Sequence, residues 1–164
     1  MIFVILGGVV EYDFSRLLKI LDELAPVLEM EKEDIIAQIG HAKYEPHNYK
    51  WFRFVDGEKF NSYVKEADVI ITHGGVSSIL KSMNFHKKII VFPRLYEFNE
   101  HLDNHQTEIC QKLADEGYVL YAENREDLMK NLKNINNFIP KLWINNNKLM
   151  KNIIYDYLVK LQGE

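Results

Sequence analysis

Two glycines and two serines lie between a buried apolar run and a predicted helix, in the segment spanning residues 68–78. Glycines let an anion approach the main chain, the first turn of a helix offers unpaired N–H groups, and the hydroxyls of Ser77 and Ser78 add donors. The segment therefore predicts a phosphate-binding loop that includes Gly74 and Gly75. A simple strand-to-helix turn, in which glycine serves tight packing, remains the alternative.

A second polar segment spans residues 93–106 and also follows an apolar run. Its side chains offer the donors and acceptors that a ring of sugar hydroxyls requires, and Arg94 can pair with a phosphate. If both segments follow strands of one parallel sheet, their polar residues converge on the same edge. The alternative is a solvated loop with a helix cap at Asp103.

Four histidines are candidates for proton transfer, because imidazole titrates near neutral pH. They are His41, His73, His101 and His105. The last two stand four residues apart, as in some zinc sites, but Leu102 occupies the position where a zinc protease has its glutamate. No two aspartates are separated by a single residue, so the metal-diphosphate clamp of many sugar transferases is missing. We expect no metal and no further cofactor.

Apolar runs alternate with helical patterns along the chain. The runs predict strands at residues 2–6, 34–39, 51–55, 68–72, 88–93 and 118–121. Apolar residues at helical spacing predict helices at residues 14–25, 59–65, 76–85 and 103–116, the first capped by Asp13 and the last ended by Gly117. This alternation implies an α/β fold, a Rossmann-like doubly wound parallel sheet of about six strands with right-handed crossovers.

The first predicted strand ends at Gly7 and Gly8, which would lie at the same edge as the phosphate loop. The residues that follow lack the spacing of the dinucleotide fingerprint, and no P-loop sequence occurs in the chain. A bound phosphate must therefore be held by other main-chain and side-chain donors.

Length and composition limit the number of domains and the kinds of partner that we expect. The chain has 164 residues, of which 47% are hydrophobic, so we expect one domain with a packed core. A net charge of −4 argues against nucleic acid as a partner. The lone Cys110 cannot form an internal disulfide, and no apolar run approaches the roughly 20 residues that cross a bilayer. With no leader-like amino terminus, a cytoplasmic protein is expected.

The last segment differs in kind from the rest. After Pro140 comes a polar stretch and then one apolar face at helical spacing. We therefore expect residues 1–140 to form the domain and residues 141–164 an amphipathic helix, packed on the domain or on a partner. The apolar face consists of Met150, Ile153, Ile154, Tyr157, Leu158 and Leu161.

Residues 67–80 resemble the carboxyl-terminal, donor-binding half of family 28 glycosyltransferases, the MurG type. Residues 100–106 are more similar to small bacterial capsular and exopolysaccharide transferase subunits of the PssE kind. These in turn resemble the catalytic subunit of the eukaryotic dolichol-linked N-acetylglucosaminyltransferase. The likeness covers nearly the whole chain, including residues 38–41.

The resemblance implies the carboxyl-terminal half of a GT-B hexosyltransferase that is inverting, independent of metal and supplied with a UDP-sugar. The diphosphate would lie near Gly75, Ser77 and Ser78. The related pattern has a ribose-binding glutamate where this sequence has Lys81. The predicted catalytic residues are His73, His101 and His105. The predicted donor-binding residues are Gly7, Gly8, Gly74, Gly75, Val76, Ser77, Ser78, Arg94, Glu100, Asp103, Asn104 and Gln106, with the sugar near the last two and His105.

Donor binding alone does not account for catalysis. Even a modest enzyme lowers its barrier by about 8 kcal/mol, whereas a charge at a helix terminus contributes at most roughly 2 kcal/mol. The rest must come from holding an acceptor beside the donor and from a base. The resemblance implies a membrane-associated partner subunit that binds a lipid-linked saccharide acceptor, with this chain at the inner face of the membrane.

Two other functions stay open. The first is a non-catalytic nucleotide-sugar-binding or regulatory module of the same fold, which the lysine at position 81 favours. The second is a sugar-nucleotide epimerase of similar architecture, although such an enzyme normally carries both of its domains in one chain.

Overall fold

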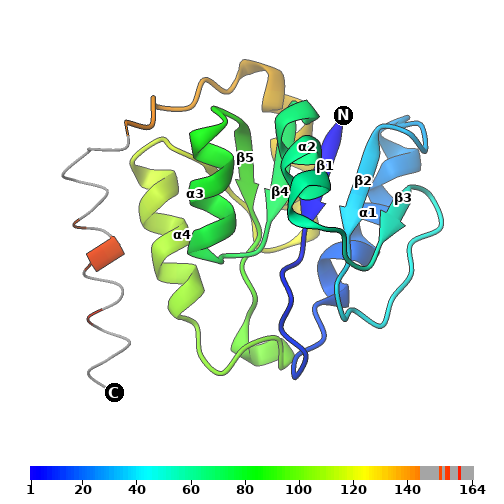
Figure 1. Ribbon diagram of the computed structural model, residues 1–164, viewed down its shortest axis with the longest axis horizontal. Coiled ribbons are helices and arrows are strands. Elements are labelled where there is room, and N and C mark those ends of the chain that lie inside the picture. The colour runs from blue at the N-terminus through cyan, green and yellow to red at the C-terminus, as the bar shows by residue number, and fades with distance from the viewer. Residues whose placement is uncertain (145–151, 153, 156–158, 160–164) are drawn as a thin grey trace.

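The computed structural model describes residues 1–144, 152, 154, 155 and 159. Within these residues one parallel sheet has the strand order β3-β2-β1-β4-β5-β6 (Figure 1). The strands are β1 (Ile2–Ile5), β2 (Ile35–Gln38), β3 (Lys50–Phe52), β4 (Val69–Thr72), β5 (Lys88–Val91) and β6 (Leu120–Tyr121). The predicted doubly wound α/β fold with six strands is confirmed.

Helices cover both faces of the sheet. Buried residues of α1 and α5 belong to one core, and those of α2, α3 and α4 belong to the other, which faces the viewer in Figure 1. The helices are α1 (Ser15–Val27), α2 (Gly57–Glu66), α3 (Val76–Asn84), α4 (His105–Asp115) and α5 (Arg125–Asn134), with short 3-10 turns η1 (Tyr96–Phe98) and η2 (Ile135–Asn137).

The two central strands explain why the sheet is buried on both sides. Every residue of β1 and of β4 is buried. Successive side chains point to opposite faces, so that Val4 enters the core under α1 while Phe3 and Ile5 enter the core under α2 and α3. A continuous apolar run is therefore what these positions require.

The prediction that Asp13 caps the first helix is wrong. Helix α1 has Phe14 at its N-cap and no side-chain cap. Asp13 Oδ1 instead accepts from Ser15 Oγ at 2.5 Å and from the main-chain N–H of Lys43 at 3.2 Å. The carboxylate thus ties the start of α1 to the loop after β2.

Helix α5 was not predicted, although its start carries a local signal. The side chain of Asn124 accepts from the N–H of Asp127, and Glu126 adds a second acidic residue to the first turn. Such a start is typical of a helix, and Leu128 and Leu132 bury its apolar face.

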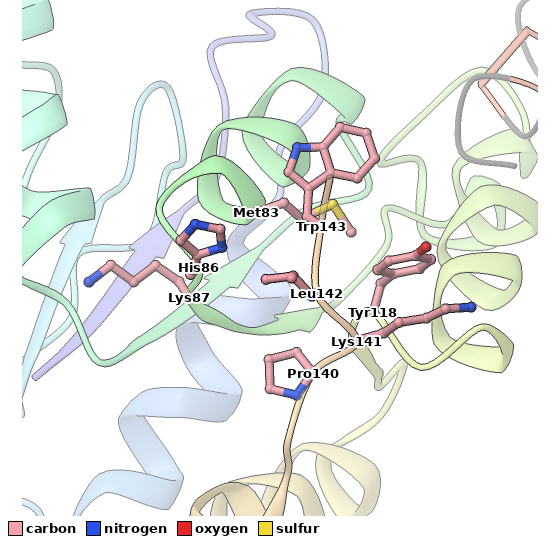
Figure 2. A pocket seen from close by; sticks show the side chains of 8 residues that line it. All are labelled: Met83, His86, Lys87, Tyr118, Pro140, Lys141, Leu142 and Trp143. Carbon is pink, nitrogen blue, oxygen red and sulfur yellow. The ribbon is translucent and has the colours of Figure 1, made fainter. Parts of the chain in front are cut away.

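After η2 the chain crosses the amino-terminal edge of the sheet (Figure 1). The N–H of Lys141 donates to the Gly117 carbonyl at 2.9 Å, and Trp143 Nε1 donates to Asn84 Oδ1 at 2.7 Å. Figure 2 shows the small pocket of about 50 Å³ that this crossing closes over Met83 and Tyr118. It lies at the opposite edge from the predicted site.

The predicted terminal helix falls mostly outside the described residues. Of its apolar face, Ile154 is described, and it packs partly buried against the core under α3 and α4. The division at residue 140 and the surface that the helix covers stay predictions. Among the described residues, no helix is both long and apolar enough to span a membrane.

Candidate donor site at the carboxyl edge

The turns after β1 and β4 meet at the carboxyl edge of the sheet. The strand order reverses between these two neighbours, and in open α/β sheets ligands bind at this place. Gly7 follows β1, and His73 follows β4. The main chain joins them, because the N–H of His73 donates to the Ile5 carbonyl at 3.2 Å.

The His73 ring fills the space between two glycines. A Cβ on Gly7 would lie 2.7 Å from the ring carbon Cε1, and a Cβ on Gly75 would overlap Nε2. Gly7 also has a φ of +80°, which favours glycine. The ring therefore accounts for glycine at both positions.

His73 is a neutral, packed side chain. Burial, and then the positive charge of Arg94, lower the pKa of His73 to about 4. Its Nδ1 lies 3.2 Å from the Ile5 carbonyl, so the proton of the neutral ring is on Nδ1. This arrangement suits a residue that shapes the turn better than one that donates a proton at neutral pH.

Gly74, in the predicted phosphate loop, packs against α4. A Cβ at this position would lie 2.7 Å from Gln106 Cβ and 3.0 Å from Cys110 Sγ. The Oε1 atom of Gln106 is buried and has no hydrogen-bond partner among the described residues. The two polar segments found in the sequence therefore meet, as we expected.

The amino terminus of α3 is open. Gly75 is its N-cap, no side chain caps it, and no acidic residue stands in its first turn. Ser77 is exposed, while Val76 and Ser78 are half-buried. Main-chain N–H groups and two hydroxyls are thus available for an anion.

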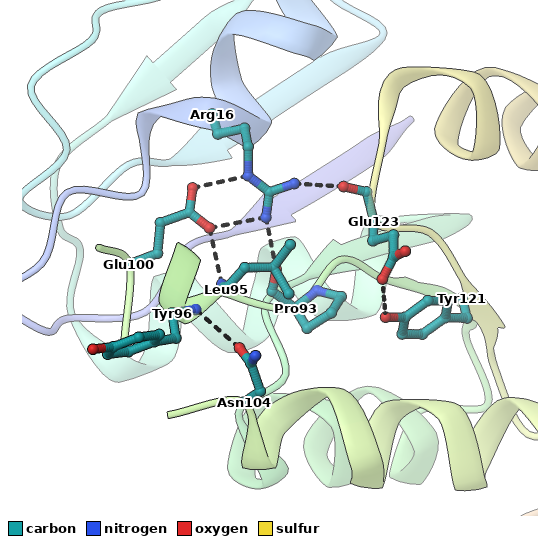
Figure 3. A network of polar contacts seen from close by, with 8 residues as sticks. All are labelled: Arg16, Pro93, Leu95, Tyr96, Glu100, Asn104, Tyr121 and Glu123. Atoms are coloured by element: carbon teal, nitrogen blue, oxygen red, sulfur yellow. Dashed lines mark hydrogen bonds and ion pairs between the residues drawn. The ribbon is translucent and has the colours of Figure 1, made fainter. Parts of the chain in front are cut away.

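Glu100 was predicted to bind the donor, but the structure gives it another task (Figure 3). Arg16 Nε lies 2.9 Å from Glu100 Oε1, and Arg16 Nη2 lies 2.8 Å from Oε2. The N–H of Leu95 also donates to Oε2, at 3.0 Å. Because Glu100 is 2% exposed and both of its oxygens are engaged, it holds the loop after β5 in place.

Sequence reasoning missed Arg16. Its guanidinium lies over the rings of Phe92 and Phe98, 4.5 Å and 4.8 Å from their centroids, and donates to the Pro93 carbonyl at 3.0 Å. Arg16 and Glu100 are 84 residues apart in the chain. No local pattern in the sequence indicates such a pair.

The loop before α4 is held by its own polar residues. Asp103 lies 3.2 Å from His101 Nδ1 and 3.0 Å from His105 Nδ1, and both histidines help to lower its pKa. Asn104 Oδ1 accepts from the N–H of Tyr96 at 2.9 Å, and its amide donates to Glu97. These contacts hold His101 and His105 beside Asp103 on the rim where α4 begins.

Three other residues singled out in the sequence make different contacts. Arg94 is buried beneath the turn after β1 and donates to the Leu6 carbonyl. Lys81 Nζ lies 4.9 Å from the centroid of the Phe60 ring, so it faces α2. His41 lies beside Phe54 in the turn after β2. In the part of the chain that the structure describes, no cluster of three His, Cys, Asp or Glu side chains could hold a metal.

The sequence of residues 2–159 matches the family model described as the glycosyltransferase family 28 C-terminal domain. The chain belongs to this family. Its carboxyl edge, with Gly74 against Gln106, stays the predicted donor site of this family 28 domain.

Two similar proteins are named as glycosyltransferase subunits. The UDP-N-acetylglucosamine transferase subunit ALG13 of Candida albicans is 25% identical over 140 residues, which are 85% of this chain and 45% of that protein. The human subunit of the same name is 28% identical over 130 residues, 76% of this chain and 11% of that protein. This family 28 domain therefore spans less than half the length of either relative.

Solved structures confirm the fold. The solution structure of ALG13 superposes with a TM-score of 0.62 at 18% identity, over 93% of each chain. The crystal structure of the kitacinnamycin glycosyltransferase superposes with a TM-score of 0.57 at 15% identity, over 99% of this chain and 39% of that one. The family 28 domain has the Rossmann-like fold of the carboxyl-terminal half of a GT-B glycosyltransferase.

Proposed function

We propose that this domain binds a UDP-sugar at its carboxyl edge and is the donor-binding subunit of a two-component glycosyltransferase. One observation carries the proposal. The main chain at Gly74 lies against Gln106, so the open amino terminus of α3 and the polar start of α4 form one surface. The amino terminus of α3 suits a phosphate, and the polar start of α4 suits a sugar. A nucleotide sugar needs both side by side.

The diphosphate lies, in this proposal, against the main chain at Gly7, Gly8 and Gly75 and accepts from the hydroxyls of Ser77 and Ser78. No carboxylate stands in the first turn of α3 to repel it. Backbone and hydroxyl donors then replace a metal. The sugar lies at Asn104, His105 and Gln106, where the buried amide oxygen of Gln106 accepts from a hydroxyl.

The proposed reaction is hexosyl transfer with inversion. An acceptor hydroxyl attacks the anomeric carbon, the bond to the diphosphate breaks, and UDP leaves with the electron pair. His101 and His105 are the candidates to take the hydroxyl proton. His73 is less suited, because its ring is packed and neutral and its proton lies towards Ile5.

The acceptor side belongs to a second, membrane-associated subunit in this proposal, and the acceptor is a lipid-linked saccharide. Support comes from the word "subunit" in the names of the relatives and from their greater length. A location at the inner face of the membrane follows from such a partner. Capsular or exopolysaccharide synthesis is supported by the motif of residues 100–106 alone, since the relatives are named as UDP-N-acetylglucosamine transferase subunits.

Calorimetric titration with UDP tests the proposal. We expect binding that weakens about fivefold in Ser77→Ala, the loss of one hydrogen bond. Ser62→Ala is the matched control, because Ser62 is a half-buried helical serine of α2, away from the proposed site, whose hydroxyl donates to Glu66. No binding at millimolar UDP, with the partner subunit present or absent, contradicts the proposal.

A non-catalytic module of the same fold is the second candidate, favoured by the position of Lys81 over Phe60, which leaves no side chain from residue 81 for the ribose. It predicts UDP binding without sugar transfer by the reconstituted pair, and no effect of His105→Ala. The two candidates are thus separated by a single transfer assay on the pair.

A further inference from the structure

Arg94 lies inside the molecule, beneath the turn after β1. It is 2% exposed, and its Nη2 donates to the Leu6 carbonyl at 2.7 Å. Its Nε and Nη1 have no hydrogen-bond partner among the described residues. A buried cation with unmet donors is costly, and native proteins keep such groups where they serve a purpose.

A ligand does not reach this guanidinium. Arg94 lines a gap together with Leu6, Gly7 and Tyr12, and that gap is too narrow to hold a water molecule. A diphosphate above Gly7 would therefore lie over the turn, with the main chain between it and the cation.

The hydrogen bond to Leu6 fixes the end of β1. The next residue, Gly7, turns with a φ of +80° and comes against the His73 ring. The position of Arg94 thus decides the shape of the turn on which the donor is proposed to rest.

The charge beneath the turn is positive. Arg16 and Arg94 both interact with the buried carboxylate of Glu100, which Arg16 holds with two hydrogen bonds, and Arg16 also acts on the exposed carboxylate of Glu97. Among the three of these groups that are buried or half-buried, two cations and one anion leave an excess of one positive charge, and the exposed Glu97 carboxylate is screened by water. In a low-dielectric interior such a charge acts strongly on an anion at the edge above it.

We propose that Arg94 is a positioning residue for donor binding: it holds the turn after β1 in shape, and its buried charge attracts the diphosphate without touching it. This inference rests on the proposed function. The proposed role differs from a direct contact with the phosphate, because such a contact would need the guanidinium to be exposed at the carboxyl edge of the sheet.

The pKa of His73 depends on the charge of Arg94 in the protein without ligand. Its ring faces Ile5 and Thr72 on the central strands, and the charged or titrating groups that act on it are Arg94 after β5 and His101 in the following loop. Removing the cation at position 94 should raise the pKa of His73, because it is one of the causes that lower it.

The test follows His73 by NMR titration and UDP affinity by calorimetry in Arg94→Met and Arg94→Lys. For Arg94→Met we expect a higher His73 midpoint and UDP binding about tenfold weaker. Arg94→Lys keeps the charge and should restore the midpoint and most of the affinity. Arg125→Met removes an equal charge from the exposed pair with Glu23 and should change neither.

A folded Arg94→Met protein with the wild-type midpoint and affinity overturns the inference, as does an Arg94→Lys protein that binds UDP as weakly as Arg94→Met. If Arg94→Met does not fold, the Nε–H signal of Arg94 in the wild-type protein is followed by NMR as UDP is added. A small shift supports the positioning role of Arg94. A large downfield shift means that Arg94 pairs directly with the diphosphate, and it overturns the inference. Absence of UDP binding by the wild type contradicts the proposed function instead, and the His73 titration still tests Arg94.

Discussion

The main chain at Gly74 lies against Gln106 in the first turn of α4. A Cβ added to Gly74 would lie only 2.7 Å from the Cβ of Gln106. Both residues are buried, so neither can withdraw without moving a packed element. Two polar segments that are separate in the sequence become one surface through this contact. The candidate donor site depends on it.

Gly74→Ala should separate the two segments. The added methyl group meets Gln106 Cβ and Cys110 Sγ, and overpacking of this kind costs about 1–3 kcal/mol. We expect a lower free energy of unfolding and weaker UDP binding. Gly57→Ala is the control, since a Cβ there meets nothing within 4 Å, and its stability should be unchanged or slightly higher. Equal UDP affinity in Gly74→Ala and the wild type would count against the joined site.

Glu100→Gln should destabilise the loop after β5. The substitution leaves Arg16 without its bidentate partner in a largely buried setting, and breaking a buried pair costs about 3–5 kcal/mol. Denaturant unfolding measures the loss. Glu45→Gln breaks the ion pair with Arg53. The side chains of Arg53 and Glu45 are 48% and 51% exposed, so the loss should be less than about 1 kcal/mol. Similar losses in the two variants would contradict the role assigned to Glu100.

Stability should fall as the pH drops from about 6.5 to about 4. His73 has a pKa lowered to about 4 in the folded protein and a normal value near 6.5 when unfolded, so in this window the unfolded chain binds more protons. The free energy of unfolding should decrease by about 3 kcal/mol across the window. His73→Gln should show a flatter profile. Identical pH dependence in both proteins would exclude this role of His73.

Cys110 should be unreactive in the folded protein. Its side chain is fully buried against Gly74, and burial raises the pKa of its thiol to about 12. Little thiolate is present at neutral pH, and a thiol reagent lacks access. A colorimetric thiol reagent should label the protein after denaturation and not before. Fast labelling of the native protein would mean that the loop opens away from α4.

The fold could be predicted because the signals that set it are local. The continuous apolar runs of β1 and β4 and the glycines that follow them indicate buried parallel strands and turns at one edge. Helix α5 was missed although Asn124 and the acidic first turn mark its start. The strand and helix ends differ from the predicted ones by up to three residues, since side-chain patterns constrain ends weakly.

The sequence predicted that the two polar segments meet at one edge, and Gly74 does lie against Gln106, whereas the part each residue plays in binding stays a prediction. Glycine-rich and polar segments after strands identify the edge where Ser77 and Gln106 lie. Whether a polar side chain faces a ligand or the interior depends on partners far along the chain. Glu100 pairs with Arg16, and Arg94 reaches the Leu6 carbonyl 88 residues away, so their roles could not be found from spacing.

The most direct test of the account maps UDP on the free domain by backbone amide NMR. We predict that the largest shifts fall at Gly7, Gly75, Ser77, Ser78 and Gln106, at the carboxyl edge of the sheet. Shifts confined to the opposite edge, around Tyr118 and Trp143, would contradict it.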